Sequence, residues 1–414
     1  MPRKREFDVI VWGATGFTGR LVAAHLAATQ HLRDDFVWAI GGRDADKLNQ
    51  VADSLANGSQ RPAIVTGDAT DVDDMQALAR RTRVVASTVG PYTRYGGGLV
   101  AACARSGTNY CDLAGEVPWV RRMIDAHQKT AQESGAILVP CSGFDSVPSD
   151  LGTYFLQQTC QSVFGAPAQR VHFLLRKADG GVSGGTVTSM LEIAREAQTS
   201  ARTRQLLRDP YSLNPRGTSG KDRAESLGFG RDELTGEWVA PFLMAAINTR
   251  VVRRSAALLE DLYGHDFRYS EFVTTGNGAA AAIKAAAISG AMASLFAGAA
   301  LPPTRALIAK VLPKPGEGPD DKARNDGCFV IDLVGLTEAG ESITVRVTGD
   351  RDPGYGATSR MLGETAYLLS QRRSTREVKP GFSTPAAAGG QFLIDALEQH
   401  GGMRFVTRAH SPAG

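Results

Sequence analysis

The fold of the amino-terminal part of this chain is decided by the stretch Val9-Ile10-Val11-Trp12-Gly13-Ala14-Thr15-Gly16-Phe17-Thr18-Gly19. It opens with an apolar run of strand length, and glycines then recur at every third position. The residues that follow, 20–29, are rich in Ala and Leu and predict a helix. A strand, a glycine turn and a helix in this order are typical of a dinucleotide-binding unit.

Each glycine of this turn has a separate role in approaching a pyrophosphate. Gly13 allows the tight turn, Gly16 lets backbone N–H groups reach the phosphates, and Gly19 lets the helix pack close to the strand. The phosphates would lie at the helix N-terminus, where unpaired N–H groups and the positive end of the helix dipole favour anions. The expected cofactor contacts in this turn are Gly13, Thr15, Gly16, Phe17, Thr18 and Gly19.

The next apolar run, residues 36–40, ends at Gly41-Gly42-Arg43 and not at an acidic residue. A carboxylate at this place would accept a hydrogen bond from a ribose 2′-hydroxyl, whereas an arginine suits a 2′-phosphate. The sequence therefore predicts NADP(H) as cofactor in preference to NAD(H). The alternative is that Arg43 is a solvated cation at the start of a helix over residues 44–56.

The composition is that of an ordinary globular protein long enough for two domains, with 414 residues, 43% hydrophobic and 21% charged. The net charge of +3 is small, and no basic run is interleaved with aromatic residues, so we expect no nucleic-acid partner. The five cysteines form no C-x-x-C pair, which favours a reducing compartment and no metal site. With a polar N-terminus and no signal peptide, the expected location is cytoplasmic.

One uncharged segment, residues 285–301, complicates the interpretation of the chain as an ordinary globular protein. It is shorter than the roughly 20 strongly apolar residues that a membrane-spanning helix needs. Because Ala and Gly dominate it, we expect a buried and tightly packed helix. The alternative is a helix that contacts a membrane peripherally or lines a lipid pocket.

Strand-like and helix-like segments alternate up to residue 140, which predicts an α/β fold with a Rossmann-type, doubly wound parallel sheet. Ligands of such sheets bind beyond the carboxyl ends of the strands. Asp68 would accept a hydrogen bond from the adenine amino group or cap a helix. Gly90-Pro91 falls where the nicotinamide end of the cofactor should lie. The next residue, Tyr92, would either donate a proton or pack as an aromatic of the loop.

Beyond residue 150 the pattern changes to a mixture of helices and antiparallel strands. The segments 328–336 and 342–348 predict a hairpin, and the polar segment 209–237 predicts a surface loop or lid. We therefore expect an NADP-binding domain over residues 1–150 and an α+β domain for substrate binding and homodimerisation over 151–350. Helices in 351–414 would return to the nucleotide domain. The arginines Arg250, Arg253 and Arg254 would hold an anion or face solvent on a helix.

Taken together, several stretches resemble the saccharopine dehydrogenase-like oxidoreductases. They are Gly13–Gly19, Gly42-Arg43, Thr88–Tyr92, Tyr110–Glu116 and Ser142–Asp150. The later stretches Ser183–Thr186, Asn248–Ser255 and Lys314–Pro319 extend the resemblance to the mycobacterial trans-acting enoyl reductases. The resemblance implies an NADPH-dependent reductase in lipid biosynthesis. Its substrate would be an acyl or polyketide intermediate, carried by a polyketide synthase that lacks its own enoyl reductase domain.

For that activity we expect hydride transfer to the β-carbon of an enoyl group and protonation at its α-carbon. Tyr92 is the expected proton donor, and Asp145 would orient substrate or water. Two other functions remain open. One is an oxidoreductase of the same fold acting on C=O or C–N bonds. The other is a protein that binds NADP(H) as a sensor or scaffold without turnover.

Overall fold

The computed structural model describes residues 5–56, 60–180, 184–300, 304–305, 318–371 and 378–411. The chain divides into two compact units. Unit 1 comprises Met1–Phe144, Pro315–Gly318 and Gly354–Gly402, and unit 2 comprises Asp145–Lys314, Pro319–Pro353 and Met403–Gly414. The first boundary thus falls just before Asp145, and the last residues of the chain belong to unit 2.

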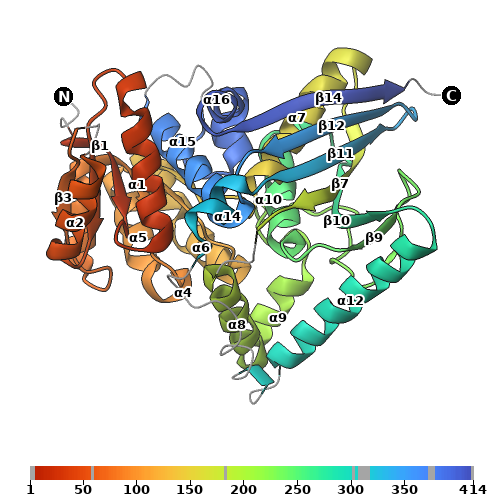
Figure 1. Cartoon of the computed structure of the whole chain (residues 1–414), viewed down its shortest axis with the longest axis horizontal. Helices are drawn as coiled ribbons and strands as arrows, with labels where there is room; N and C mark the ends of the chain where they lie inside the picture. The colour runs from red at the N-terminus through yellow and green to blue at the C-terminus, as the bar shows by residue number, and fades with distance from the viewer. Residues whose placement is uncertain are drawn as a thin grey trace. The chain divides into compact units, whose positions relative to one another are not determined.

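Unit 1 is built on a seven-stranded sheet, sheet A, with strand order β13-β6-β5-β4-β1-β2-β3 (Figure 1). Every neighbouring pair is parallel, which confirms the doubly wound parallel sheet that the alternating sequence predicts. Its strands are β1 (Phe7–Trp12), β2 (Trp38–Gly42), β3 (Ala63–Thr66), β4 (Thr82–Ser87), β5 (Asn109–Asp112), β6 (Ile137–Val139) and β13 (Gly381–Phe382).

Helices cover sheet A because its strands are apolar on both faces. Val9 and Val11 of β1 pack in one core cluster with residues of α1, α2 and the late helix α15. Alternate β1 residues, such as Ile10, are buried on the other face. The helices of unit 1 are α1 (Phe17–Thr29), the 3₁₀ turn η1 (Gln30–Leu32), α2 (Ala45–Leu55), α3 (Val72–Arg81), α4 (Tyr92–Tyr95), α5 (Gly97–Ser106), α6 (Val117–Ser134), α15 (Thr358–Ser370) and α16 (Pro385–His400), and the π-helical turn η2 (Pro353–Ala357) precedes α15.

Unit 2 contains a second seven-stranded sheet, sheet B, with strand order β14-β12-β11-β7-β10-β9-β8. Only β7 and β10 pair in parallel, and the other neighbours are antiparallel, including the expected β11–β12 hairpin. The predicted α+β unit with antiparallel strands is therefore confirmed. Its strands are β7 (Ala168–Ala178), β8 (Gly230–Arg231), β9 (Trp238–Pro241), β10 (Arg268–Gly276), β11 (Phe329–Thr337), β12 (Ser342–Gly349) and β14 (Met403–Ser411).

The helices of unit 2 are α7 (Val147–Phe164), α8 (Gly184–Thr199), α9 (Ala201–Arg208), α10 (Ala245–Leu258), α11 (Glu260–Tyr263), α12 (Ala279–Ala300) and α14 (Asp321–Asp326). Residues 184–208 form two consecutive helices, α8 and α9. Ser200 separates α8 from α9, and its hydroxyl caps α9 by accepting a hydrogen bond from the Thr203 N–H.

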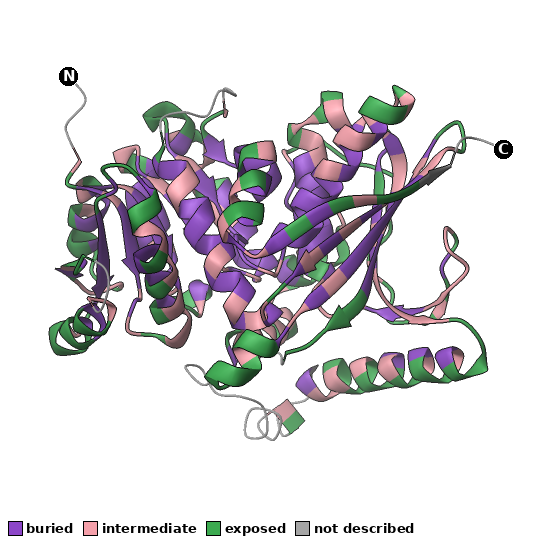
Figure 2. Cartoon of the chain, turned by 45° about the horizontal axis from the view of Figure 1, so that its top comes forward, coloured by how far each residue is buried: buried purple, intermediate pink, exposed green. Residues whose placement is uncertain are grey.

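The apolar helix α12 is exposed, so the expectation of a buried helix is wrong for its described residues (Figure 2). Ala281, Ala285 and Ser289 form a narrow buried stripe, whereas Ile283 is 70% exposed. Only 17% of its most apolar part is buried, and by length and composition alone it would suffice to cross a membrane. Lack of charge does not enforce burial here, because alanine and glycine side chains present little apolar area per residue. The last residue of the segment, Leu301, lies outside the described residues.

Candidate functional site

The glycine turn between β1 and α1 leaves no room for a side chain at two of its three glycines. Gly13 has a φ of +90°, and a Cβ there would lie 2.7 Å from the Val89 side chain. A Cβ on Gly19 would lie 2.2 Å from the carbonyl oxygen of Gly13. The turn therefore packs the start of α1 against the end of β1 as closely as backbone allows.

The third glycine, Gly16, is exposed and stands at the N-terminus of α1. A Cβ there would meet only the Gly13 carbonyl oxygen, at 3.3 Å, so the outer side of this residue is open. Among the described residues no side chain caps α1, and its first turn contains no acidic residue. The positive end of the helix is thus left for an anion, which fits a pyrophosphate. Thr15, Phe17 and Thr18 complete this turn as half-buried residues.

Arg43 is exposed and follows directly after β2. The end of β2 is tied to the glycine turn, because the N–H groups of Gly13 and Ala14 both donate to the carbonyl oxygen of Gly41, at 2.9 and 3.1 Å. Arg43 is therefore two residues beyond Gly41, which contacts the glycine turn directly. Its side chain is therefore at the carboxyl edge of sheet A, where a 2′-phosphate would need a cation.

Asp68 follows β3 at the same edge and shapes a turn. Its carboxylate accepts hydrogen bonds from the N–H and the hydroxyl of Thr70, at 2.8 and 2.7 Å. These bonds lower the pKa of Asp68, and the positive charge of Arg43 adds to the effect. The helix cap of α3 is Asp71, so the alternative of a capping role for Asp68 is wrong.

The loop after β4 contains Gly90 and Pro91, joined by a cis peptide bond, and then Tyr92. The Tyr92 side chain is buried, and its hydroxyl donates to the Ser87 carbonyl oxygen at 3.0 Å. The same hydroxyl accepts from the Leu113 N–H at 3.1 Å. Tyr92 therefore links the ends of β4 and β5, and it can reach a substrate only by giving up one of these bonds.

Sequence reasoning assigned no role to Glu116, which shapes the same loop. This carboxylate is fully buried and accepts hydrogen bonds from the N–H groups of Tyr92 and Thr93, at 3.1 and 2.8 Å, and from the Thr93 hydroxyl. It ends one of the stretches that carry the family resemblance, but its contacts could not be expected from the sequence, because its partners lie more than twenty positions earlier in the chain. It fixes the loop after β4 by satisfying two backbone donors.

Asp145 stands at the end of the loop that follows β6, and it is the first residue of unit 2. The residue is half-buried, and among the described residues no group forms a hydrogen bond with its carboxyl group. Burial raises the pKa of Asp145 to about 7. A carboxyl group with this pKa is partly protonated at neutral pH, which is the property of a general acid.

A second buried carboxyl group, Asp112 at the end of β5, organises the same loop. It accepts hydrogen bonds from the N–H groups of Ala114 and Cys141, at 2.9 and 3.1 Å, and from the Tyr110 hydroxyl at 2.8 Å. Burial raises the pKa of Asp112 to about 7, although these donors oppose the shift. Its Oδ1 accepts from the two backbone N–H groups and its Oδ2 accepts from the Tyr110 hydroxyl, so we regard Asp112 as a positioning residue.

The three arginines of α10 neither face solvent nor stand open for an anion, so both sequence interpretations are wrong. All three are buried, and they hold the segment after α9. Arg250 donates to the Leu207 carbonyl oxygen at 2.7 Å, and Arg254 donates to the Leu213 carbonyl oxygen. Arg253 pairs with Asp222 at 2.6 Å. The expected lid, residues 209–237, is thus tied to α10 at Leu213 and Asp222.

Comparison with known families identifies residues 9–139 as a saccharopine dehydrogenase NADP binding domain. These residues include the glycine turn, Arg43, Asp68 and Tyr92, and the cofactor of the chain is therefore NADP(H). This family match agrees with the open N-terminus of α1 at Gly16, which we call the cofactor cradle.

Two relatives are similar over nearly the whole chain. A protein of Mycobacterium tuberculosis H37Rv, provisionally named a trans-acting enoyl reductase, is 41% identical and covers 98% of this chain and 99% of its own length. The trans-acting enoyl reductase of Mycobacterium bovis BCG is 37% identical with the same coverage. Among solved structures, apo saccharopine dehydrogenase (L-Glu forming) from Saccharomyces cerevisiae matches 97% of this chain and 99% of its own. Its TM-score is 0.52 at 13% identity, so this likeness concerns the fold alone.

Proposed function

Because this chain belongs to the family of trans-acting enoyl reductases, we propose that it is an NADPH-dependent reductase of an enoyl C=C bond. The substrate class is an acyl or polyketide intermediate of lipid biosynthesis. The observations that support this most directly are two separate ones: the glycine turn leaves the N-terminus of α1 open for an anion, and the carboxyl group of Asp145, with a pKa of about 7, has no hydrogen-bond partner among the described residues.

We assign the cofactor contacts to residues at the carboxyl edge of sheet A. The backbone N–H groups at Gly16 and the start of α1 bind the pyrophosphate, and Arg43 binds the 2′-phosphate. Asp68 accepts a hydrogen bond from the adenine amino group. The loop of Gly90 and Pro91 lies against the nicotinamide. When bound, NADPH supplies the hydride for the β-carbon.

The chain must then deliver a proton to the α-carbon. Hydride addition to the β-carbon would move the C=C electron pair between the α-carbon and the carbonyl carbon and the carbonyl π pair onto the oxygen. Protonation at the α-carbon then restores the carbonyl group. We assign the proton to the carboxylic acid of Asp145, which becomes a carboxylate and regains its proton from water. Tyr92 is the alternative donor, but its hydroxyl proton already bonds to the Ser87 carbonyl oxygen.

The test is the variant Asp145→Asn, assayed by NADPH oxidation with an enoyl thioester. We expect kcat to fall by about 10²–10⁴-fold, as for the loss of a general acid, with NADPH affinity unchanged. The acid form is the active one, so kcat of the native protein should be full below pH 7 and fall as the pH rises through about 7. The variant should lack this alkaline limb.

A matched control is Asp261→Asn, an exposed aspartate of α11, which should leave kcat and its pH profile unchanged. If Asp145→Asn kept both native kcat and the native pH profile, Asp145 would be excluded as the proton donor, and Tyr92 would remain.

Two alternative functions are separated by the same assay. Faster NADPH oxidation with a 3-oxoacyl thioester or an imine would indicate a reductase of C=O or C–N bonds. NADPH binding without oxidation by any of these substrates would indicate a sensor or scaffold. The enoyl substrate should be preferred when attached to a carrier domain, since the relatives are named as acting in trans.

We further propose a cytoplasmic homodimer in which α12 of one copy is covered by the other. The support is the length of exposed apolar helix, with Ile283 and Phe296 both exposed. Ile283→Glu should convert a dimer into a monomer in light scattering. A protein that is monomeric before the substitution, or that floats with lipid vesicles through α12, would replace the dimer with peripheral membrane contact.

A further inference from the structure

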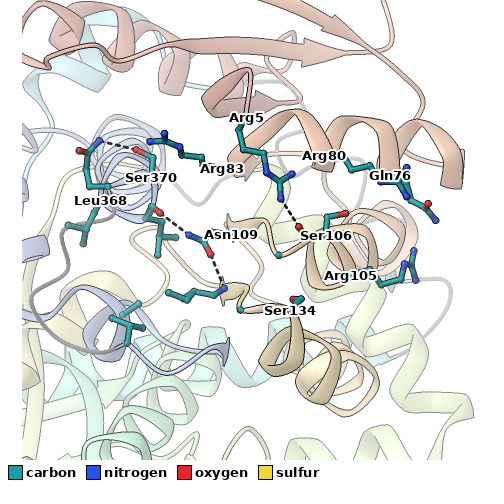
Figure 3. Close-up of a pocket in the computed structure, with 17 residues that line it drawn as sticks. Arg5, Gln76, Arg80, Arg83, Arg105, Ser106, Asn109, Ser134, Leu368 and Ser370 are labelled. Carbon is teal, nitrogen blue, oxygen red and sulfur yellow. Dashed lines mark hydrogen bonds between the residues drawn. The ribbon is translucent and has the colours of Figure 1, made fainter. Parts of the chain in front are cut away.

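A cavity of about 830 Å³ opens in unit 1 at the amino edge of sheet A (Figure 3). Arg83, Asn109 and Ile137 line it, and they stand at or next to the first residues of β4, β5 and β6. The cofactor cradle is at the carboxyl edge of the same sheet, because Gly13 follows the last residue of β1. The cavity is therefore separate from the cofactor site, and nothing in the proposed reaction uses it.

The charge of this cavity is positive. Its lining includes Arg5, Arg80, Arg83 and Arg105, and no acidic side chain is among the described residues that line it. Arg83 is paired with Asp8 at 2.9 Å. Arg5 is also engaged, because it donates to the carbonyl oxygens of Ala79 and Ser106, in the last turns of α3 and α5.

The other two arginines, which stand in the last turns of α3 and α5, have no carboxylate partner among the described residues. Within the described part of the chain, neither Arg80 nor Arg105 forms a hydrogen bond or an ion pair, and both are exposed. The charge of Arg105 also helps to lower the pKa of the nearby His127, whose burial is the larger cause. Two permanent charges without a carboxylate partner, at one cavity, favour an anionic ligand.

The rest of the lining is apolar or neutral. In Figure 3, Arg80, Arg105 and Gln76 lie on one side of Asn109, and Leu368 and Ser370 lie on the other. Asn109 is fixed between them, since it donates to the Leu369 carbonyl oxygen at 2.8 Å and accepts from the Ile137 N–H at 2.9 Å. The apolar residues of the lining are Ile137, Leu368, Leu369, Val378 and Ala388. The cavity thus offers Arg80 and Arg105 at one end and hydrocarbon contacts at the other, where Arg83, paired with Asp8, also lies.

We propose that this cavity binds the phosphate monoester of a small organic molecule, separately from NADP(H). Two guanidinium groups carry two charges and ten N–H donors, which suit a phosphate dianion better than a single carboxylate. The volume lies in the range of roughly 300–1,000 Å³ that is usual for small-molecule sites, so an organic part accompanies the phosphate.

The test uses calorimetric titration of the full chain saturated with NADPH, so that the cofactor site is filled. The probes are hexyl phosphate, hexanoate and inorganic phosphate, which separate the contributions of head group and chain. Hexyl phosphate should bind saturably and at least about tenfold more tightly than either other probe. In Arg80→Gln/Arg105→Gln its affinity should fall at least about tenfold, with NADPH affinity unchanged.

The matched control is Arg223→Gln/Arg268→Gln, which removes two exposed arginines of unit 2 and should keep native affinity for hexyl phosphate. Absence of saturable binding, or equal affinity in the Arg80/Arg105 variant, would overturn the site. If inorganic phosphate bound as tightly as hexyl phosphate, the proposal that the ligand has an organic part would be wrong. If hexanoate bound as tightly as hexyl phosphate, the proposal that the ligand carries a phosphate would be wrong. None of these outcomes depends on turnover, so a failure here differs from a failure of the proposed reduction.

Discussion

The two edges of sheet A both present positive charge, but they do so with different parts of the chain. At the carboxyl edge the charge comes mainly from backbone N–H groups at the start of α1, which seven consecutive residues, Gly13 to Gly19, position. At the amino edge it comes from arginine side chains, with lining residues spread from Arg5 to Ala388. A site made of local backbone geometry can be recognised in a sequence, whereas a site gathered from distant side chains requires the fold.

The largest effect should come from removing the backbone geometry of the carboxyl edge. Gly19→Ala places a Cβ 2.2 Å from the Gly13 carbonyl oxygen, so the turn must open. We expect a loss of roughly 2–4 kcal/mol in the free energy of unfolding and at least a hundredfold loss of NADPH affinity. Thermal unfolding and fluorescence titration measure the two. The control Gly290→Ala in α12, with no atom within 4 Å of the added Cβ, should fold normally.

A smaller effect is expected at Arg43, whose proposed cofactor contact at this edge depends on its side chain. Arg43→Ala should lower NADPH affinity by about 10–100-fold and leave NADH affinity unchanged, since only NADPH carries the 2′-phosphate. Titration with both nucleotides tests this. Arg61→Ala, which removes an exposed arginine paired with Asp53, is the control. Equal losses for both nucleotides would mean that Arg43 supports the turn instead of the phosphate.

The smallest effects are expected from two substitutions, one at each edge of sheet A, which should differ in their effect on kcat. Tyr92→Phe at the carboxyl edge loses the bonds to Ser87 and Leu113, at a cost of about 1–3 kcal/mol in stability. If Tyr92 also donates the proton, kcat falls while NADPH affinity is retained. Thr108→Val at the amino edge loses one buried bond to the Ala79 carbonyl oxygen and should cost about 1 kcal/mol with no change in kcat. Denaturant unfolding and steady-state kinetics give both quantities.

The sequence was sufficient for sheet A because its strands and helices alternate and each is short and apolar. It was also sufficient for the glycine turn, where the structure shows the steric reason for Gly13 and Gly19. It was not sufficient for Glu116 and Asp112, whose partners are backbone groups of other loops. Nor could it show that Asp145 lacks hydrogen-bond partners within the described residues, because that depends on which groups surround it.

Unit 2 was harder to predict, for two physical reasons. The arginines of α10 suggested an anion site or a solvated face, but charged side chains can also be buried when carboxylates and carbonyl oxygens compensate them, as Asp222 compensates Arg253. The composition of α12 suggested burial, but nothing in the sequence states how many neighbours a helix will have. The final strand β14 gave no clear strand signal and was not expected.

The pairing of β14 with β12 has a consequence for how the protein is made. The two strands are separated in the sequence by α15, β13 and α16, which belong to unit 1. During synthesis, β12 therefore leaves the ribosome well before its outer neighbour and presents an open edge until β14 follows. Open edges pair readily with other chains. The time during which the edge of β12 stays unpaired is thus set by the time needed to translate residues 350–402. Slower translation of that segment would give β12 more time to pair with other chains.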